Sequence, residues 1–184
     1  MAHIDRRPGI RPRASIGRRL DMAARSSFPA CITVLLMLLT QIPLQLPGQA
    51  ALLQAVAFGC VWFWSVYRPG AMPPPVVFAT GLAMDLMGYL PLGVGGFALL
   101  AVHGAAVTMR RSLSRGGFAW VWIVFAGIAA AASVTIWLLV MLLSFRLLPP
   151  YPAIFTAVVT IAIFPLLEMP FAAAHRTIAD PDRA

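Results

Sequence analysis

Few side chains in this 184-residue sequence could do chemistry, and one of them, Asp85, lies inside an apolar stretch. A charge at depth in a membrane is costly, so such a carboxylate is expected to face protein or water and to serve a purpose. Three roles are open for Asp85. The first is that of a structural carboxylate that binds backbone N–H groups or a neighbouring helix. The second is a contact for a partner protein, and the third is a proton- or ligand-binding group of a transporter.

Three other polar residues stand near apolar stretches. His103 is alone in its stretch, and we interpret it as a packing residue, since a direct pair with Asp85 is not favoured by the expected difference in depth. Glu168 is expected to reach the membrane interface and to meet His175 or nearby arginines. Arg146 either binds the last carbonyls of the helix before it or contacts a partner, and both interpretations stay open.

Motifs of enzymes are missing from the sequence. It has no G-x-x-x-x-G-K-[ST] phosphate loop and no H-E-x-x-H, and its three histidines fall at three different levels. Cys31 and Cys60 both lie in apolar segments and are interpreted as small hydrophobic residues. We therefore expect no enzyme activity, no cofactor and no metal site.

The composition indicates a membrane protein. Hydrophobic residues make up 60% of the sequence and charged residues 11%, with a mean hydropathy of +0.85. Soluble domains have about 25% charged and roughly 45–50% apolar residues. A soluble domain with so few charges could not cover its surface, so we predict one all-α integral membrane domain.

Six apolar stretches are predicted to form a bundle of six transmembrane helices in a membrane domain that spans residues 28–174. A helix needs about 20 apolar residues to cross a bilayer core of about 30 Å. The third and fourth stretches are shorter and are joined by an uncharged turn. They form either two full spans or a helical hairpin that does not fully cross the bilayer, and both interpretations stay open. Trp62, Trp64 and Tyr67 are expected in the interfacial aromatic belt. The predicted spans are 28–46, 50–67, 74–90, 93–109, 118–143 and 150–173.

Arginine supplies all 14 basic residues, and the net charge is +8. Seven of them precede Phe28, in a tail over residues 1–27 that we expect to be disordered. We expect six spans with both termini in the cytoplasm, including a C-terminal tail at 175–184. This topology places thirteen arginines inside and only Arg146 outside, which is a strong positive-inside signal. The arginines expected to set topology or to contact lipid include Arg18, Arg19, Arg25, Arg110 and Arg111.

The alternative for the arginine-rich tail is a contact with anionic lipid or with a cytoplasmic partner. A nucleic-acid partner is not expected, because no aromatic residue interleaves these arginines and no reading module follows. We interpret the first apolar stretch as a retained span and not as a cleaved signal peptide, since its basic leader is long and no A-x-A site follows.

Glycines share the face of the third span that carries Asp85. Gly81, Asp85 and Gly88 recur at helical spacing, and Gly93 follows across the turn. Small residues allow close approach of another helix. The face is therefore predicted to be a helix–helix contact surface, on which a partner helix could dock and be fixed in register by Asp85.

The same segment resembles the signature of the MreD family, small membrane proteins of the bacterial rod-shape machinery. The family pattern, roughly G-x-x-x-D-L followed by L-G, is met by Gly81, Asp85, Leu86, Leu92 and Gly93. The resemblance covers about residues 30–176. Other positions fit as well: Gln41-Ile42-Pro43, Arg68, Ser144-Phe145-Arg146 and Pro165.

The resemblance implies a non-enzymatic scaffold in the bacterial cytoplasmic (inner) membrane. MreD-like proteins act with MreC, a single-span periplasmic protein, and with the MreB filament, and they support the RodA glycosyltransferase and a class B penicillin-binding protein in lateral peptidoglycan synthesis. The fold implied is similar to the six-helix membrane S-components of vitamin transporters. The alternative is a small-solute-binding subunit of a transporter, with Asp85 and His103 as candidate ligands.

Overall fold

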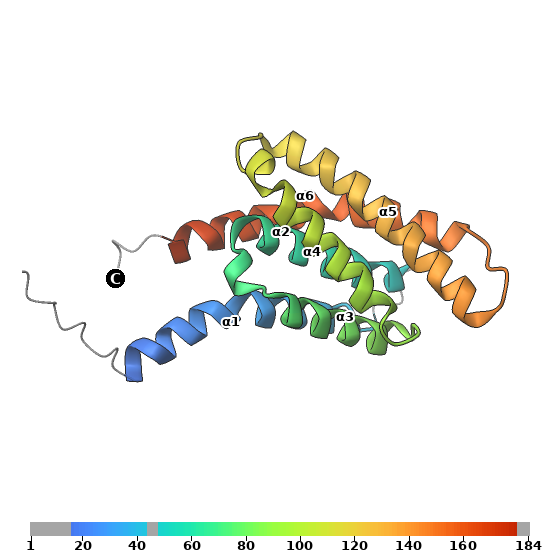
Figure 1. Cartoon of the computed structure of the whole chain (residues 1–184), viewed down its shortest axis with the longest axis horizontal. Coiled ribbons are helices and arrows are strands. Elements are labelled where there is room, and N and C mark those ends of the chain that lie inside the picture. Colours follow the sequence, from blue (N-terminus) through green and yellow to red (C-terminus); the bar gives the residue numbers. More distant parts are fainter. Residues whose placement is uncertain (1–15, 44–47, 180–184) are drawn as a thin grey trace, which may run out of the picture.

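The computed structural model describes the backbone of residues 16–43 and 48–179, and the side chains of residues 27–43 and 48–171. Within these ranges the chain is all-helical, with six α-helices, one short 3-10 helix and no strand (Figure 1). The elements are α1 (Ile16–Leu39), α2 (Gln49–Tyr67), η1 (Pro69–Ala71), α3 (Pro74–Gly88), α4 (Val94–Leu113), α5 (Phe118–Ser144) and α6 (Tyr151–Ala179).

The ends of the helices follow the predicted spans closely for α2, α3 and α5, which differ from them by at most two residues. α1 departs most, because it begins at Ile16 and ends at Leu39, whereas a disordered tail was expected through residue 27 and a span over 28–46. The added segment contains Ala, Leu, Met and Arg, which favour helix. The structure does not describe the side chains of Arg18, Arg19 and Arg25.

Three of the helices are long and apolar enough to cross a membrane among the residues that the structure describes: Gln49–Tyr67, Phe118–Ser144 and Tyr151–Phe171. α3 has 15 residues and is therefore about 22 Å long, less than the bilayer core of about 30 Å. The apolar part of α1, Ser27–Leu39, is also short. The fold is thus a helical bundle with three clear candidate spans, where the sequence predicted six.

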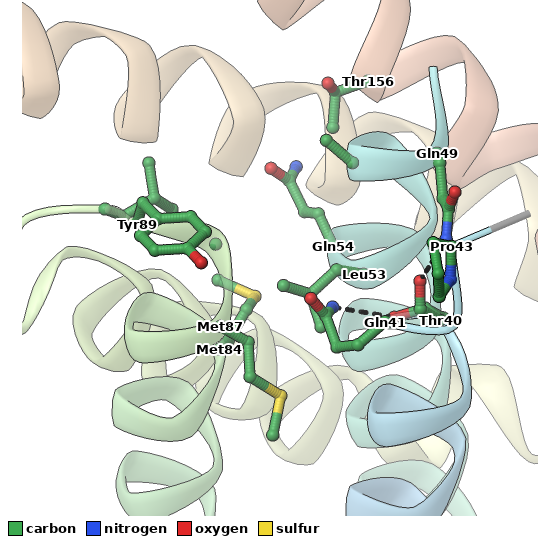
Figure 2. A pocket seen from close by; sticks show the side chains of 13 residues that line it. Thr40, Gln41, Pro43, Gln49, Leu53, Gln54, Met84, Met87, Tyr89 and Thr156 are labelled. Carbon is green, nitrogen blue, oxygen red and sulfur yellow. Dashed lines mark hydrogen bonds between the residues drawn. The ribbon is translucent and has the colours of Figure 1, made fainter. Parts of the chain in front are cut away.

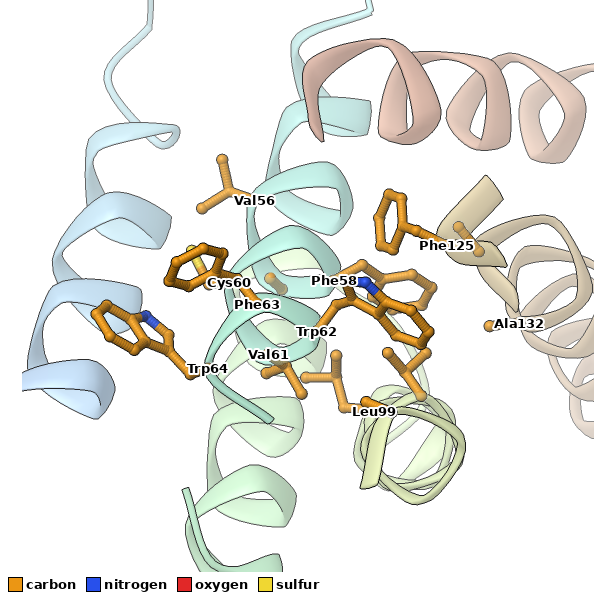
Figure 3. Packing of buried hydrophobic residues seen from close by; sticks show 14 of the residues in the cluster. Val56, Phe58, Cys60, Val61, Trp62, Phe63, Trp64, Leu99, Phe125 and Ala132 are labelled. Atoms are coloured by element: carbon orange, nitrogen blue, oxygen red, sulfur yellow. The ribbon is translucent and has the colours of Figure 1, made fainter. Parts of the chain in front are cut away.

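α2 lies at the centre of the bundle. Its side chains are apolar around the whole circumference, and a helix of this kind is buried on all sides. Figure 3 shows Trp62 pointing toward Phe125 of α5, at 5.7 Å between ring centroids, and Trp64 pointing toward α1. Both tryptophans are fully buried, so the predicted place in the interfacial belt is wrong for both. Packing against five neighbouring helices outweighs the preference of tryptophan for an interface.

The neighbours of α2 fix the direction of the other helices. α6 runs parallel to α2, since Gly48 lies beside Phe155 and Gly59 beside Leu167. α4 is also parallel to α2, because Arg110 near its end binds Val66 near the end of α2. α3 is antiparallel to α2, since Gly88 at its end lies beside Leu53. One end of the bundle, here called the arginine end, carries Arg68, Arg110, Arg111 and Arg115. The opposite end, here called the hairpin end, carries the α3–α4 turn at 89–93 and the α5–α6 loop at 145–150. The start of α1 and the last turns of α6 both lie at the arginine end (Figure 1).

The outer faces of α5 and α6 are apolar. Only 28% and 22% of their most apolar segments are buried within the bundle, and large hydrophobic side chains cover the remainder. Soluble monomers rarely expose apolar patches of more than a few hundred Å². These faces therefore suit a lipid environment. Their exposed residues include Ile123, Leu138, Leu142, Ile154, Val158 and Leu166.

Candidate functional site

The carboxylate of Asp85 binds the beginning of α4. The α3–α4 turn folds back because Tyr89 adopts a left-handed conformation at φ +54° and Gly93 does so at φ +97°. Asp85 Oδ2 then accepts a hydrogen bond of 2.8 Å from the Gly93 N–H, and Oδ1 accepts one of 2.7 Å from the Gly95 N–H. The side chain of Asp85 is completely buried. Its charge is thus held by backbone donors inside the protein.

This arrangement is chemically sound for a buried carboxylate. The first N–H groups of a helix have no partner within that helix, and the helix dipole favours negative charge beside them. Asp85 supplies from α3 the acceptors that α4 lacks, and hydrogen bonds to a charged acceptor are the stronger kind. Both oxygens are occupied. Of the three roles open from the sequence, the geometry is that of a structural carboxylate at the hairpin.

The glycines around Asp85 bring α3 and α4 into backbone contact. A Cβ on Gly81 would overlap the Cα of Gly96, and a Cβ on Gly95 would overlap the Asp85 carboxylate. Small residues at such crossings let two helices approach closely. The partner of the glycine face is therefore α4 of the same chain. This corrects the expectation that a helix of another protein docks on this face.

Gly88 and Gly93 lie in the same hairpin but differ in their need for glycine. A Cβ on Gly88 would lie 3.4 Å from the Leu53 side chain of α2, an ordinary van der Waals contact. A Cβ on Gly93 would meet nothing within 4 Å, but the positive φ of Gly93 disfavours other residues. Of the two, Gly93 is thus favoured by its backbone conformation, whereas Gly88 has room for a small side chain.

His103 lies apart from Asp85 and has its own partner. Its Nδ1 is 2.8 Å from Ser65 Oγ on α2, and both side chains are buried. This hydrogen bond joins α4 to the central helix in the middle of the bundle. The structure thus gives His103 a partner that sequence reasoning did not identify, because Ser65 is one of many small residues in an apolar segment.

Arg110 and Arg146, two of the arginines expected at the membrane surfaces, differ in whether they bind the end of a helix. Arg110 Nε donates a hydrogen bond of 2.8 Å to the carbonyl of Val66, near the end of α2, and so supplies a donor that this helix end lacks. Arg111 is exposed beside it. Arg146 is exposed and makes no hydrogen bond within the described part of the chain. The helix-capping interpretation therefore fits Arg110 and not Arg146.

Glu168 of α6 forms a side-chain hydrogen bond with Tyr67 at the end of α2. Its other oxygen, Oε2, is buried and has no hydrogen-bond partner. The same holds for Nη1 of Arg68. From the sequence, Glu168 is expected to meet nearby arginines or His175, whose side chain lies outside those described. The observed contact is instead with α2, because α2 and α6 run parallel.

A cleft of about 460 Å³ opens at the hairpin end beside the Asp85 turn. Thr40 and Gln41 of α1, Gln54 of α2, Tyr89 after α3 and Thr156 of α6 bring polar groups to its wall (Figure 2). Sequence reasoning missed this cleft, because the ends of α1, α3 and α6 that line it with α2 are spread over more than 100 residues of the chain. Gln54, a polar residue inside an apolar stretch, could have indicated the site, because polar side chains within the membrane are often functional.

Neither a metal-binding group nor a similar known protein gives further information on the function. No group of three His, Cys, Asp or Glu residues that could hold a metal ion occurs among the residues described here. No family model, no curated protein and no solved structure matches the chain.

Proposed function

We propose that this protein is a non-enzymatic membrane scaffold of the MreD kind, which acts in the bacterial cell-elongation machinery and supports lateral peptidoglycan synthesis. One observation carries the proposal. Three of the five residues that match the family signature, Gly81, Asp85 and Gly93, belong to a single structural unit, in which Asp85 binds the amides of Gly93 and Gly95 and Gly81 packs against Gly96. These three residues thus have a physical reason to occur together.

The surfaces of the bundle support a location in the bacterial inner membrane. The exposed apolar faces of α5 and α6 suit lipid. Four arginines lie at the arginine end, while only Arg146 lies at the hairpin end among the described residues. Cytoplasmic loops carry an excess of arginine and lysine. In this proposal the chain is multi-pass with the arginine end and both termini in the cytoplasm.

The polar groups support a non-enzymatic role. Asp85 has both oxygens occupied by backbone donors, and His103 is held by Ser65. Ser65 and His103 have the spacing of a nucleophile and a base, but Ser65 is completely buried within the bundle. A substrate would have to displace the central helix to reach it.

The proposed partner surface is the exposed side of the hairpin. The two leucines of the signature, Leu86 and Leu92, are 66% and 68% exposed, although Asp85 and Gly81 of the same signature are buried. We assign this leucine surface, Leu86 and Leu92, to the single membrane helix of MreC. Contacts with MreB, RodA and a class B penicillin-binding protein belong to the same proposal.

The alternative, a small-solute-binding subunit of a transporter, relied on Asp85 and His103 as ligands. Both residues have internal partners in the structure, at 2.7–2.8 Å. A solute would have to break these hydrogen bonds in order to bind. The scaffold is therefore the better-supported proposal.

Site-specific photo-crosslinking tests the partner surface. A photoreactive amino acid at Leu86 or Leu92 should capture MreC in the host membrane. The matched control is Leu166 of α6, which is 69% exposed but lies on another helix. Crosslinks from Leu166 as strong as those from Leu86 and Leu92, or none from the two signature leucines, would contradict this surface.

A further inference from the structure

The cleft at the hairpin end has polar groups on walls that face one another. Figure 2 shows Gln54 reaching into it from α2 and Tyr89 lying across from it at the end of α3. Thr156 of α6 lies near Gln54, and Thr40 and Gln41 border the cleft from the end of α1. A volume of about 460 Å³ lies in the range typical of small-molecule sites. The cleft is thus large enough for a compact ligand and has convergent hydrogen-bonding groups.

The threonine hydroxyls and one amide N–H each of Gln41 and Gln54 are already engaged. Thr40 and Thr156 donate their hydroxyl hydrogens to carbonyls of their own helices, at 2.6 and 2.8 Å. Gln54 Nε2 donates to Ser133 Oγ at 2.7 Å, and Gln41 Nε2 donates to Thr40 Oγ1 at 3.2 Å. The amide oxygens of Gln41 and Gln54 and the hydroxyl oxygen of Thr156 accept no hydrogen bond from the described residues. Gln41 and Gln54 each keep a second amide N–H, and Tyr89 brings a hydroxyl, so the cleft offers hydrogen-bond acceptors together with donors.

The remainder of the wall is uncharged. None of the 13 lining residues carries a charge, and Asp85, close to this wall, is sealed inside the hairpin. Met84, Met87 and Leu53 give the floor an apolar part. A charged ligand would lose its hydration without gaining a counter-charge, which is unfavourable. The ligand that fits is neutral, carries groups such as hydroxyls that both donate and accept hydrogen bonds, and is apolar on one side.

We propose that this cleft binds a neutral polyhydroxylated group, a sugar ring, whose hydroxyls donate to Gln54, Gln41 and Thr156. The C–H face of the ring would lie on the methionines, and the exposed Tyr89 side chain would cover it. The sugar is either free or the headgroup of a neutral glycolipid, since both present the same donors. This site does not depend on the scaffold role.

Saturation-transfer NMR of the full-length protein in dodecylphosphocholine micelles tests the proposal. Methyl β-glucoside probes the free sugar, and octyl β-glucoside probes the glycolipid headgroup. Octyl sulfate and octyltrimethylammonium serve as charged competitors with the same alkyl chain. Thr156→Val removes one acceptor at nearly constant shape. Thr108→Val is the matched control, because Thr108 also donates to the carbonyl four residues earlier but lies on α4, outside the cleft.

The proposal expects saturation of the sugar protons and a dissociation constant about 3- to 10-fold weaker in Thr156→Val, the usual effect of one hydrogen bond. Thr108→Val should bind as wild type does. Binding of both glucosides supports a free sugar as ligand, and binding of octyl β-glucoside alone supports the lipid headgroup. No saturation with either glucoside, equal weakening in the two threonine variants, or equally effective displacement by the charged amphiphiles would overturn the proposal.

A second variant guards against a failure to fold. Ala50→Phe adds bulk to the wall of the cleft from an exposed position near the start of α2. It should abolish saturation of the sugar protons while the melting temperature stays close to that of wild type. Wild-type binding in a folded Ala50→Phe variant would place the sugar elsewhere.

Discussion

Asp85 Oδ1 accepts a hydrogen bond of 2.7 Å from the backbone N–H of Gly95, across the turn that joins α3 to α4. The pair links the end of one helix to the beginning of the next through a buried charge and an unpaired helix donor. It also keeps the wall of the polar cleft in place, because the lining residues Met84 and Gly88 belong to the end of α3 and Tyr89 directly follows it. The hairpin is therefore the structural basis of both proposals.

Asp85→Asn should destabilise the protein by about 1–3 kcal/mol. Asparagine keeps one acceptor oxygen but places an NH₂ group against a second backbone N–H, and the favourable charge at the helix N-terminus is lost. The measurement is unfolding by sodium dodecyl sulfate in mixed micelles, followed by circular dichroism. A variant as stable as wild type would show that the two hydrogen bonds at Asp85 contribute little.

Gly81→Leu should be more damaging than Asp85→Asn, because even a Cβ at Gly81 overlaps the backbone of Gly96. Overpacking of a close contact costs typically about 1–3 kcal/mol, and more when backbone is in the way. Gly104→Ala is the control, since a Cβ there meets nothing within 4 Å, and alanine should gain about 0.5–1 kcal/mol in a helix. Equal unfolding free energies for Gly81→Leu and Gly104→Ala would contradict the α3–α4 contact.

Ser65 and His103 should be energetically coupled. Single variants Ser65→Ala and His103→Leu and the double variant form a mutant cycle, with an expected coupling energy of about 0.5–1.5 kcal/mol for the buried hydrogen bond. Unfolding free energies in micelles supply the four values. Strict additivity of the two substitutions would mean that the 2.8 Å contact between these side chains has no net energetic effect.

The tryptophans should respond differently to brominated lipids, which quench fluorescence at the lipid boundary. Trp62 and Trp64 are fully buried, whereas Trp120 and Trp122 are exposed. Trp120→Phe should lower the quenched fraction of the emission, and Trp62→Phe should raise it. The reverse pattern would place α2 at the lipid boundary and not in the core of the bundle.

The proposed orientation can be measured with cysteine labelling. In a background with Cys31→Ser and Cys60→Ala, Arg146→Cys should react with a membrane-impermeant maleimide in intact cells. Arg115→Cys, at the arginine end, should react only after the inner membrane is opened. Both residues are exposed and suit labelling. Labelling of Arg115→Cys in intact cells would invert the proposed topology.

The sequence was informative where a single segment decides the outcome. The length of the apolar stretches and the Pro and Gly boundaries placed α2, α3 and α5 within two residues, and the glycines around Asp85 indicated a close helix contact. It did not show that α4 fills that contact, because glycine spacing does not distinguish a helix of the same chain from that of a partner.

Features built from distant segments were not predictable in the same way. Trp62 and Trp64 have the amphipathic character of interfacial residues, and only the central position of α2 makes them core residues. The cleft needs Thr156 of α6 beside Gln54 of α2, which follows from the parallel course of these helices. Periodicity within one helix contains no information on which helix lies next to it.

The most direct test of the scaffold proposal is depletion of the protein in its host, with imaging of cell shape and of labelled wall synthesis. The proposal predicts rounded or swollen cells in which new peptidoglycan is no longer confined to the lateral wall. Re-expression of the wild-type protein should restore rod shape, and Asp85→Asn should restore it less well at equal protein abundance. Depleted cells with normal shape and normally localised wall synthesis would contradict the proposal.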